Sequence, residues 1–321
     1  MVILDGHSIV PDELGWKNFS DSEHISKVDF YDNTPAGLVV ERCRGAELVL
    51  TNKVVIDSDT MDRLPELRYI GVLATGYNVV DINAAARRGI VVTNIPAYST
   101  ESVVQMTWAH ILNIYNQVGH YASENSRGRW CGSPDFCYWD SPLHELSGKT
   151  IGIVGLGNIG RRVADVALAF GMKVLALTGK SQESLPDGIT KVVLDRLLKE
   201  SDIVTLHCPL TSGTREMINR GSLAMMKSDA VLVNTGRGGL VSDADLADAL
   251  NAGRIAAYGA DVLTIEPARP DNPLVNARNC YLTPHIAWAT VEARQRLIAI
   301  CMENVRAFIE GHPVNVIHAD V

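Results

Sequence analysis

Three polar side chains stand just beyond apolar stretches in the second half of the sequence. Arg237 lies in VNTGRGGLV, Glu266 in ADVLTIEP and His285 in LTPHIAWAT. The planar guanidinium of arginine holds a carboxylate through two parallel hydrogen bonds. Histidine titrates near neutral pH and can exchange a proton with a hydroxyl or carbonyl oxygen. A glutamate beside it would hold the ring and favour its protonated form. These residue types predict acid/base chemistry on a small carboxylic acid.

Each of these residues also has a purely structural explanation. Arg237 could be an exposed loop residue, and Glu266 a solvated turn residue before Pro267. His285 could be a histidine at the start of a helix whose hydrogen bonds are satisfied within the fold. Their shared position favours a functional role. All three follow predicted parallel strands, whose carboxyl ends meet at one edge of a sheet, where ligands bind in open α/β folds.

The element that would position them is the stretch TIGIVGLGNIG, residues 150–160. An apolar strand pattern, G-x-G-x-x-G and a helical pattern that ends at Gly171 follow one another, which is typical of dinucleotide binding. Gly155 permits a tight turn, Gly157 lets a pyrophosphate approach the backbone, and Gly160 lets the helix pack on the strand. The N–H groups of the helix start would face the phosphates. The alternative is a glycine-rich turn without function.

Strands and helices continue to alternate on both sides of this turn, which predicts two doubly wound parallel-sheet α/β lobes. A long amphipathic helix, 290–309, is expected to return to the first lobe. Strands are predicted at 2–4, 28–31, 47–51, 69–73 and 90–93, and again at 173–177, 203–206, 230–234, 257–260 and 280–282. Helices are predicted at 60–64, 83–88, 101–118, 195–200, 220–225 and 243–251.

Two connecting stretches have open interpretations. LATGYNVVD, residues 73–81, follows a predicted strand, and the N–H groups of Ala74, Thr75 and Gly76 could form an anion nest for a carboxylate or a plain turn. The aromatic-rich stretch 127–149 follows the helix that begins after the crossover at 95–100. It could pack on a partner subunit or within its own chain.

The composition excludes several classes of protein. Of 321 residues, 46% are hydrophobic and 21% charged, which is ordinary for a globular protein, and the net charge of −8 argues against nucleic acid as a main partner. Six scattered cysteines without a C-x-x-C pair predict no disulfide framework and no metal site. With no signal peptide at the N-terminus and no apolar run of membrane length, we expect a cytoplasmic protein.

Motifs along essentially the whole chain carry a family resemblance. GLGNIG, LHCPLT, VNTGRGGLV, DVLTIEP and TPHIAWAT occur in one order, and ATGYNVVD, NIPAYSTESV and GHPVNVI match as well. In these motifs the chain resembles the D-isomer-specific 2-hydroxy acid dehydrogenases, especially the glycerate dehydrogenase/hydroxypyruvate reductase branch. The resemblance implies hydride transfer between NAD(P)H and a small 2-oxo acid such as hydroxypyruvate or glyoxylate. It also implies a homodimer formed through residues 101–150.

The resemblance implies a division of labour between the lobes. A flavodoxin-like substrate lobe would comprise 1–98 and 289–321, and a Rossmann nucleotide lobe 99–288. Arg237 would bind the substrate carboxylate and carbonyl, His285 would be the acid/base, and Glu266 its partner. The backbone of Leu73, Ala74, Thr75 and Gly76 would hold the substrate carboxylate. The implied dinucleotide contacts are Thr107, Gly155, Gly157, Asn158, Ile159, Gly160, Thr178, Gly179, Lys180, His207, Cys208, Pro209, Thr214, Thr235, Gly236, Arg237, Asp261, His285 and Ala287.

One departure from the family pattern concerns the cofactor. Members that use NAD carry an acidic residue at the end of the second strand of this lobe, where this chain has Thr178. Loss of the acid removes repulsion of a 2′-phosphate, and Thr178, Lys180 and Ser181 offer hydrogen-bond donors. The sequence therefore favours NADP(H). NAD(H) remains the alternative, because a single charge is screened by salt.

Other functions share this fold and these motifs. A D-lactate-type dehydrogenase with a different substrate is one alternative. A phosphoglycerate dehydrogenase of the longer kind is disfavoured, because 321 residues leave no room for its regulatory domain. A dinucleotide-sensing corepressor is the alternative of another class, and a short acidic chain without disordered tails disfavours it.

Overall fold

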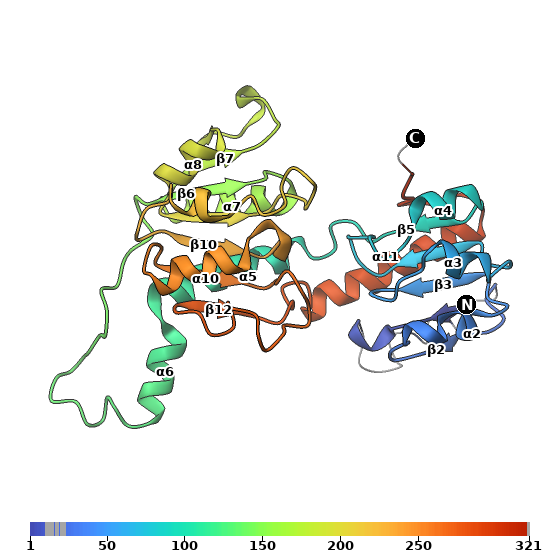
Figure 1. Cartoon of the computed structure of the whole chain (residues 1–321), viewed down its shortest axis with the longest axis horizontal. Coiled ribbons are helices and arrows are strands. Elements are labelled where there is room, and N and C mark those ends of the chain that lie inside the picture. Colours follow the sequence, from blue (N-terminus) through green and yellow to red (C-terminus); the bar gives the residue numbers. More distant parts are fainter. Residues whose placement is uncertain (10–15, 17–18, 20–23, 320–321) are drawn as a thin grey trace. The chain divides into compact units, whose positions relative to one another are not determined.

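The protein is described by a computed structural model that covers residues 1–9, 16, 19 and 24–319. The chain divides into two compact units. Met1–Ser99 and Ala289–Val321 form the first unit, and Thr100–Trp288 form the second (Figure 1). The first unit therefore combines the beginning and the end of the chain, and the second is continuous.

The first unit is built on a parallel sheet with the order β2-β1-β3-β4-β5. This is the flavodoxin-like order that the sequence predicted. Asp57 and Asp81 begin two of its helices, because their carboxylates accept the N–H groups of Thr60 and Ala84. The strands are β1 (Val2–Ile3), β2 (Asp29–Phe30), β3 (Leu48–Thr51), β4 (Tyr69–Val72) and β5 (Val91–Thr93), and the helices are α2 (Val39–Cys43), α3 (Ser58–Asp62) and α4 (Ile82–Arg87).

The C-terminal helix α11 (Val291–Ile309) packs against this sheet. Its Phe308 ring lies 4.8 Å from the ring of Tyr69 on β4, measured between centroids. Beyond the helix, Val316 forms an antiparallel bridge with Thr93 at the end of β5. The described residues 289–319 thus belong to the first unit together with the beginning of the chain.

The second unit holds a parallel sheet with the order β12-β11-β10-β9-β6-β7-β8. This is the Rossmann order, with β6 near the centre of the sheet. Strands β7 and β8 are added on one side of β6, and β9 to β12 are added on the other side. The strands are β6 (Thr150–Val154), β7 (Lys173–Leu177), β8 (Ile189–Lys191), β9 (Ile203–Leu206), β10 (Val231–Asn234), β11 (Ala257–Ala260) and β12 (Cys280–Leu282). The helices include α5 (Thr100–Asn116), α7 (Asn158–Ala169), α8 (Leu194–Glu200), α9 (Arg220–Leu223) and α10 (Asp243–Asn251).

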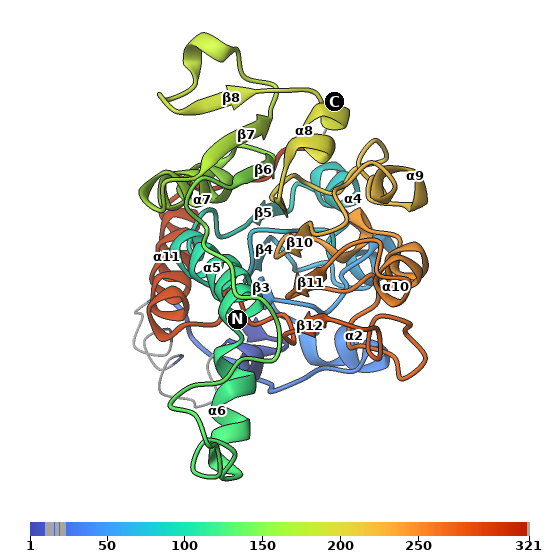
Figure 2. The same ribbon diagram turned by 90° about the vertical axis from the view of Figure 1, so that its left-hand side faces the viewer.

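This sheet separates two hydrophobic cores. On β10, Val231 and Val233 belong to the core beneath α5 and α7, whereas Leu232 belongs to the core beneath α8, α9 and α10. Side chains alternate between the faces of a strand, so one buried strand supplies both cores. Figure 2 shows α5 and α7 on one side of the strands and α9 and α10 on the other.

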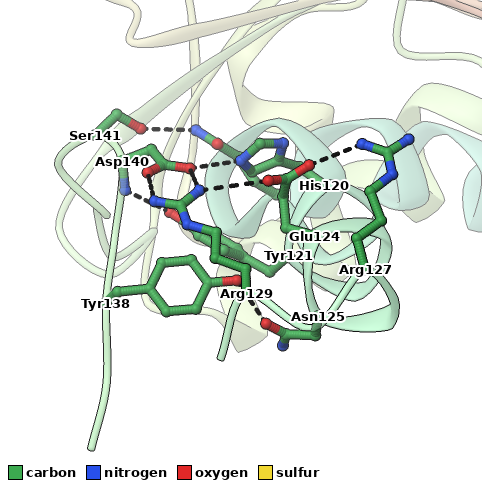
Figure 3. Close-up of polar contacts among 10 residues, drawn as sticks. His120, Tyr121, Glu124, Asn125, Arg127, Arg129, Tyr138, Asp140 and Ser141 are labelled. Carbon is green, nitrogen blue, oxygen red and sulfur yellow. Dashed lines mark hydrogen bonds and ion pairs between the residues drawn. The ribbon is translucent and has the colours of Figure 1, made fainter. Parts of the chain in front are cut away.

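An arm of residues 117–145 extends from the end of α5 (Figure 1). We expected one helix over 101–118, but Gln117 has a left-handed backbone (φ 51°) that ends α5 and starts a second helix, α6 (Val118–Ser126). Polar contacts order the arm (Figure 3): Asp140 accepts hydrogen bonds from Arg129, and His120 Nε2 lies 2.7 Å from Asp140. The guanidinium of Arg129 also covers the ring of Tyr138.

The described residues offer neither a membrane-spanning helix nor a cluster of metal ligands. No helix among them combines the length and the apolar character that a membrane span requires. No group of three or more His, Cys, Asp or Glu side chains among them is arranged to hold a metal ion.

Candidate functional site

The three glycines of the turn after β6 have distinct roles. Gly155 has a positive φ of 94°, and a Cβ there would lie 2.7 Å from the backbone nitrogen of Cys208. A Cβ on Gly160 would lie 2.0 Å from the Gly155 oxygen. A Cβ on Gly157 would meet no described atom within 4 Å, and no described side chain caps the start of α7 at Asn158. Open space before free helix N–H groups fits a pyrophosphate.

Glu266 and His285 meet at the carboxyl edge of the same sheet. Glu266 follows β11 and His285 follows β12, and 2.5 Å separates Glu266 Oε2 from His285 Nδ1. The other oxygen, Oε1, accepts the N–H of Leu263 at 2.9 Å. Both side chains are about one-third exposed, at 34% and 29%. The carboxylate is therefore oriented by its own backbone and in turn orients a ring that solvent or a ligand can reach.

The turn that presents His285 has an unusual backbone. His285 is in the left-handed region with a φ of 55°, and its N–H donates to the Thr283 oxygen. Asp261, only 1% exposed, accepts from Thr283 Oγ1 at 2.5 Å, from Ile286 N at 2.9 Å and from Ala287 N at 2.7 Å. A buried carboxylate thus holds this turn on both sides of the histidine.

Arg237 lies at the same edge, after β10. The side chain of Asn234 folds back on this loop, donating to the Arg237 oxygen and accepting the N–H of Gly236. Arg237 Nη1 donates to the Gly236 oxygen at 2.8 Å. Thr235 Oγ1 lies 2.9 Å from Thr107 Oγ1, which ties the loop to α5. The arginine therefore sits on a loop whose backbone is fixed from several directions.

The residues predicted to meet the adenosine end lie after β7. Thr178, Gly179 and Lys180 form a turn in which Lys180 N donates to Thr178 Oγ1 at 3.2 Å. Lys180 is exposed. Lys191, at the end of the neighbouring strand β8, donates from Nζ to the Lys180 oxygen at 2.6 Å. Hydroxyl and ammonium donors thus gather at the end of the second strand.

The loop after β9 also lies at this edge. Thr214 Oγ1 donates to the Pro209 oxygen at 2.7 Å and so closes the loop. The two ring nitrogens of His207 are buried and have no hydrogen-bond partner among the described residues, although the residue as a whole is partly exposed. Burial lowers the pKa of His207 to about 4, so the ring is neutral at pH 7.

In the first unit, the predicted anion nest follows β4. Leu73 N donates to the Thr51 oxygen, and Thr75 Oγ1 donates to the Ile95 oxygen at 2.8 Å. Asn94 Nδ2 donates to the Thr75 oxygen at 2.7 Å. Leu73 is therefore held by the end of β3 and Thr75 by the residues after β5, and Asn94 is a supporting residue that the sequence did not reveal.

Comparison with known proteins identifies the family. Residues 108–287 match the family described as "D-isomer specific 2-hydroxyacid dehydrogenase, NAD binding domain". A hydroxypyruvate reductase from Blautia hydrogenotrophica is 43% identical over 99% of both chains, and a glycerate dehydrogenase from Methylorubrum extorquens is 42% identical over 88% of both. A solved acyclic imino acid reductase in complex with NADPH and D-Arg superposes with a TM-score of 0.82 at 29% identity, over 99% of this chain and 100% of that one.

The chain belongs to the D-isomer specific 2-hydroxyacid dehydrogenase family. This confirms the resemblance inferred from the motifs, together with the two-sheet α/β fold. The D-2-hydroxyacid dehydrogenase is an oxidoreductase of CH–OH donors, and its second unit is a domain for a nicotinamide dinucleotide.

Besides Asn94, three residues in the dehydrogenase's second unit escaped the sequence analysis. Lys191 lies on β8, a strand that was not predicted because two of its three residues are exposed and polar. Thr283 follows a predicted strand and could have been noticed beside His285. His110 lies in α5, 173 residues from Thr283, and its ring is 3.2 Å from the Thr283 hydroxyl. No local pattern could have signalled that contact.

Proposed function

We propose that this dehydrogenase reduces a small 2-oxo acid, hydroxypyruvate or glyoxylate, to the corresponding hydroxy acid, D-glycerate or glycolate. The observation that carries the proposal is the Glu266–His285 pair at the edge of a sheet whose glycine turn is open to a dinucleotide. Relatives named hydroxypyruvate reductase and glycerate dehydrogenase, more than 40% identical, support the choice of substrate. In this proposal the second unit binds the dinucleotide and the first unit the substrate.

The residues present fit a nicotinamide dinucleotide. The start of α7 and Gly157 would receive the pyrophosphate, the turn at Thr178–Lys180 the adenosine, and the loops at Thr235 and Asp261 the nicotinamide end. When bound in its reduced form, the dinucleotide supplies the hydride for C2 of the oxo acid.

His285 would exchange the proton. Its Nδ1 is engaged by Glu266, so Nε2 is the ring atom left to face the substrate oxygen. In reduction, protonated His285 gives its Nε2 proton to the carbonyl oxygen as the carbon is reduced. In oxidation, the neutral ring takes the hydroxyl proton. Glu266 holds the ring in the orientation that both steps need.

Arg237 would bind the acid. Its guanidinium can donate two parallel hydrogen bonds to the carboxylate or one to the carbonyl oxygen, which polarises the carbonyl before reduction. The backbone N–H groups of residues 73–76 would supply further donors to the carboxylate. In this proposal the charge of Arg237 and the backbone N–H groups of residues 73–76 orient the substrate, and His285 transfers the proton.

We also propose that the enzyme prefers NADP(H). Thr178 replaces the acidic side chain that would repel a 2′-phosphate, and Lys180 and Lys191 bring two ammonium groups to the same turn. Salt screens an exposed contact between an ammonium group and a phosphate. We therefore expect the preference for NADP(H) over NAD(H) to be measurable but moderate.

We propose that the arm forms a homodimer interface, within the predicted stretch 101–150. Val118, Trp130, Phe136 and Trp139 expose 66%, 54%, 88% and 66% of their surface. Large exposed apolar side chains on one excursion are typical of a contact surface. Light scattering on Phe136→Ser/Trp139→Ser should give the mass of a single chain, and an unchanged dimer would refute this assignment.

Initial rates with hydroxypyruvate, glyoxylate and pyruvate, each with NADPH and NADH, test the proposed reaction. We expect fast reduction of hydroxypyruvate with NADPH and near-complete loss of activity in His285→Ala. Faster turnover of pyruvate would favour the D-lactate-type alternative. Tight dinucleotide binding without turnover of any oxo acid would favour a corepressor-like protein.

A further inference from the structure

The turn that carries His285 holds a conformation that L-residues avoid. A left-handed backbone at a non-glycine residue costs roughly 1 kcal/mol or more and persists only where the surroundings impose it. Here the surroundings are the Asp261 carboxylate, which takes three hydrogen bonds from residues 283, 286 and 287. The orientation of His285 therefore depends on the orientation of one buried carboxylate.

Asp261 is itself linked, through Thr283, to the side chain of His110 on α5. Thr283 Oγ1 lies 2.5 Å from Asp261 Oδ1 and 3.2 Å from His110 Nε2. A hydroxyl has one proton, and the short contact with a carboxylate is where it is most stabilised. Thr283 thus donates to Asp261 and must accept from His110. The proton of the His110 ring therefore lies on Nε2.

The ring of His110 is suited to this fixed role. It is 5% exposed, and burial lowers the pKa of His110, so the ring is neutral near pH 7 and carries one proton. Gly259 on β11 makes room for it. A Cβ on Gly259 would lie 2.9 Å from His110 Cβ and 3.1 Å from Nδ1. The strand thus lacks a side chain where α5 inserts the imidazole.

We propose that His110 and Thr283 are positioning residues that set the orientation of the Asp261 carboxylate, and through it the turn that presents His285. The hydrogen bonds run in one direction, from His110 to Thr283 to Asp261, and the carboxylate then binds the backbone on either side of the histidine. This inference rests on the proposed function in one respect, which is that His285 exchanges the proton.

The test compares variants that differ by single groups. Thr283→Val removes the hydroxyl and keeps the shape, and Thr283→Ser keeps the hydroxyl. His110→Phe keeps a ring without the donor. Thr205→Val is the control for the same substitution, because Thr205 is buried on β9 and its hydroxyl has no partner among the described residues. Thermal melts establish that each variant is folded.

Two measurements are made on each variant. The first is kcat and KM for the oxo acid. The second is the ¹H–¹⁵N spectrum of the histidine rings in the dinucleotide-free protein, with the His285 signals assigned from His285→Gln. We expect Thr283→Val to lose about 10- to 100-fold in kcat with little change in KM, since misplacement by an ångström costs about that much. The His285 signals should move in Thr283→Val and His110→Phe, and Thr283→Ser and Thr205→Val should resemble the wild type.

The outcomes separate this inference from the proposed function. Unmoved His285 signals in folded Thr283→Val overturn the positioning role, whether or not kcat falls. Failure of Thr283→Ser to restore kcat also overturns it. A wild-type protein that reduces no oxo acid refutes the proposed function, whereas the spectra still decide whether His110 and Thr283 hold the turn.

Discussion

Lys191 Nζ lies 2.6 Å from the backbone oxygen of Lys180 and donates a hydrogen bond to it. The contact joins the edge strand β8 to the turn that follows β7. It fixes the backbone of this turn and brings a second ammonium group to it. Because residues 178–181 contain no acidic side chain, charge changes here should act on the cofactor phosphate and leave the oxo-acid site alone.

Thr178→Asp should therefore weaken NADPH relative to NADH. A new carboxylate repels the 2′-phosphate and can bind a free ribose hydroxyl. We expect the ratio of the two dissociation constants to change about tenfold or more, about 1.4 kcal/mol. Calorimetry with adenosine 2′,5′-bisphosphate and AMP checks this without turnover. Lys191→Gln should act in the same direction, and Lys173→Gln, at the opposite end of β7, should have no effect. If the ratio of the two dissociation constants were the same in wild type and Thr178→Asp, the assignment of this turn to the 2′-phosphate would be ruled out.

Glu266→Gln should slow proton transfer. Glutamine still accepts the N–H of Leu263, but it no longer presents a charged oxygen to His285 Nδ1. We expect kcat for reduction to fall about 10- to 100-fold, less than or equal to the roughly 10²-fold lower end for general acid catalysis, because His285 itself is still present, with little change in KM. Steady-state rates across pH 5–9 are the measurement. Glu292→Gln, a substitution in the first turn of α11, serves as the control. A wild-type rate in Glu266→Gln would show that the carboxylate does not support the histidine.

The buried ring of His207 should make the protein sensitive to mild acid. Its pKa is lowered by burial to about 4, against 6.5 in the unfolded chain. Between these values the unfolded state binds a proton that the folded state does not, so stability falls as the pH falls from 6.5 toward 4. The loss at pH 5 is roughly 2 kcal/mol from this one group. Urea unfolding at pH 7 and pH 5 should show a smaller difference in His207→Gln than in the wild type. Equal differences would contradict the burial of the ring.

Asp5 should be important for stability of the first unit. Its side chain is buried, and its carboxylate accepts the N–H groups of Asn52 at 2.8 Å and Lys53 at 2.6 Å, just after β3. Asp5→Ala would leave two backbone donors without this acceptor, at a cost of about 2–3 kcal/mol. Asp5→Asn keeps one acceptor oxygen and should cost less. Urea unfolding curves measure both, and equal stability of the alanine variant and the wild type would exclude this role.

Much of the fold could be predicted because apolar runs and helical periods are local. The predicted strands are all present in the described residues, with ends that agree to within two residues. β8, α2 and α6 were not predicted. β8 is short and mostly exposed, and α6 buries no residue, so neither leaves an apolar pattern in the sequence.

Those residues of the candidate site that directly follow predicted strands could be predicted from the sequence. Glu266 and His285 were paired from their positions after two neighbouring strands, and the structure brings them together. The supports behind them were not visible. His110 is separated from Thr283 by 173 positions, and the two residues meet because α5 packs against β10 and β11. Sequence periodicity describes single elements, whereas a hydrogen bond between distant elements depends on the assembled sheet.

The left-handed backbone of His285 affects how substitutions in this turn change activity and stability. The strain there is balanced by contacts of Asp261 with its neighbours, so substitutions that loosen those contacts let the turn relax to an easier conformation. Such variants would lose activity, whereas the relief of strain would offset part of the stability lost with the hydrogen bonds. Screens for melting temperature and screens for turnover should therefore select against different substitutions in this turn, and neither alone would reveal its tolerance to change.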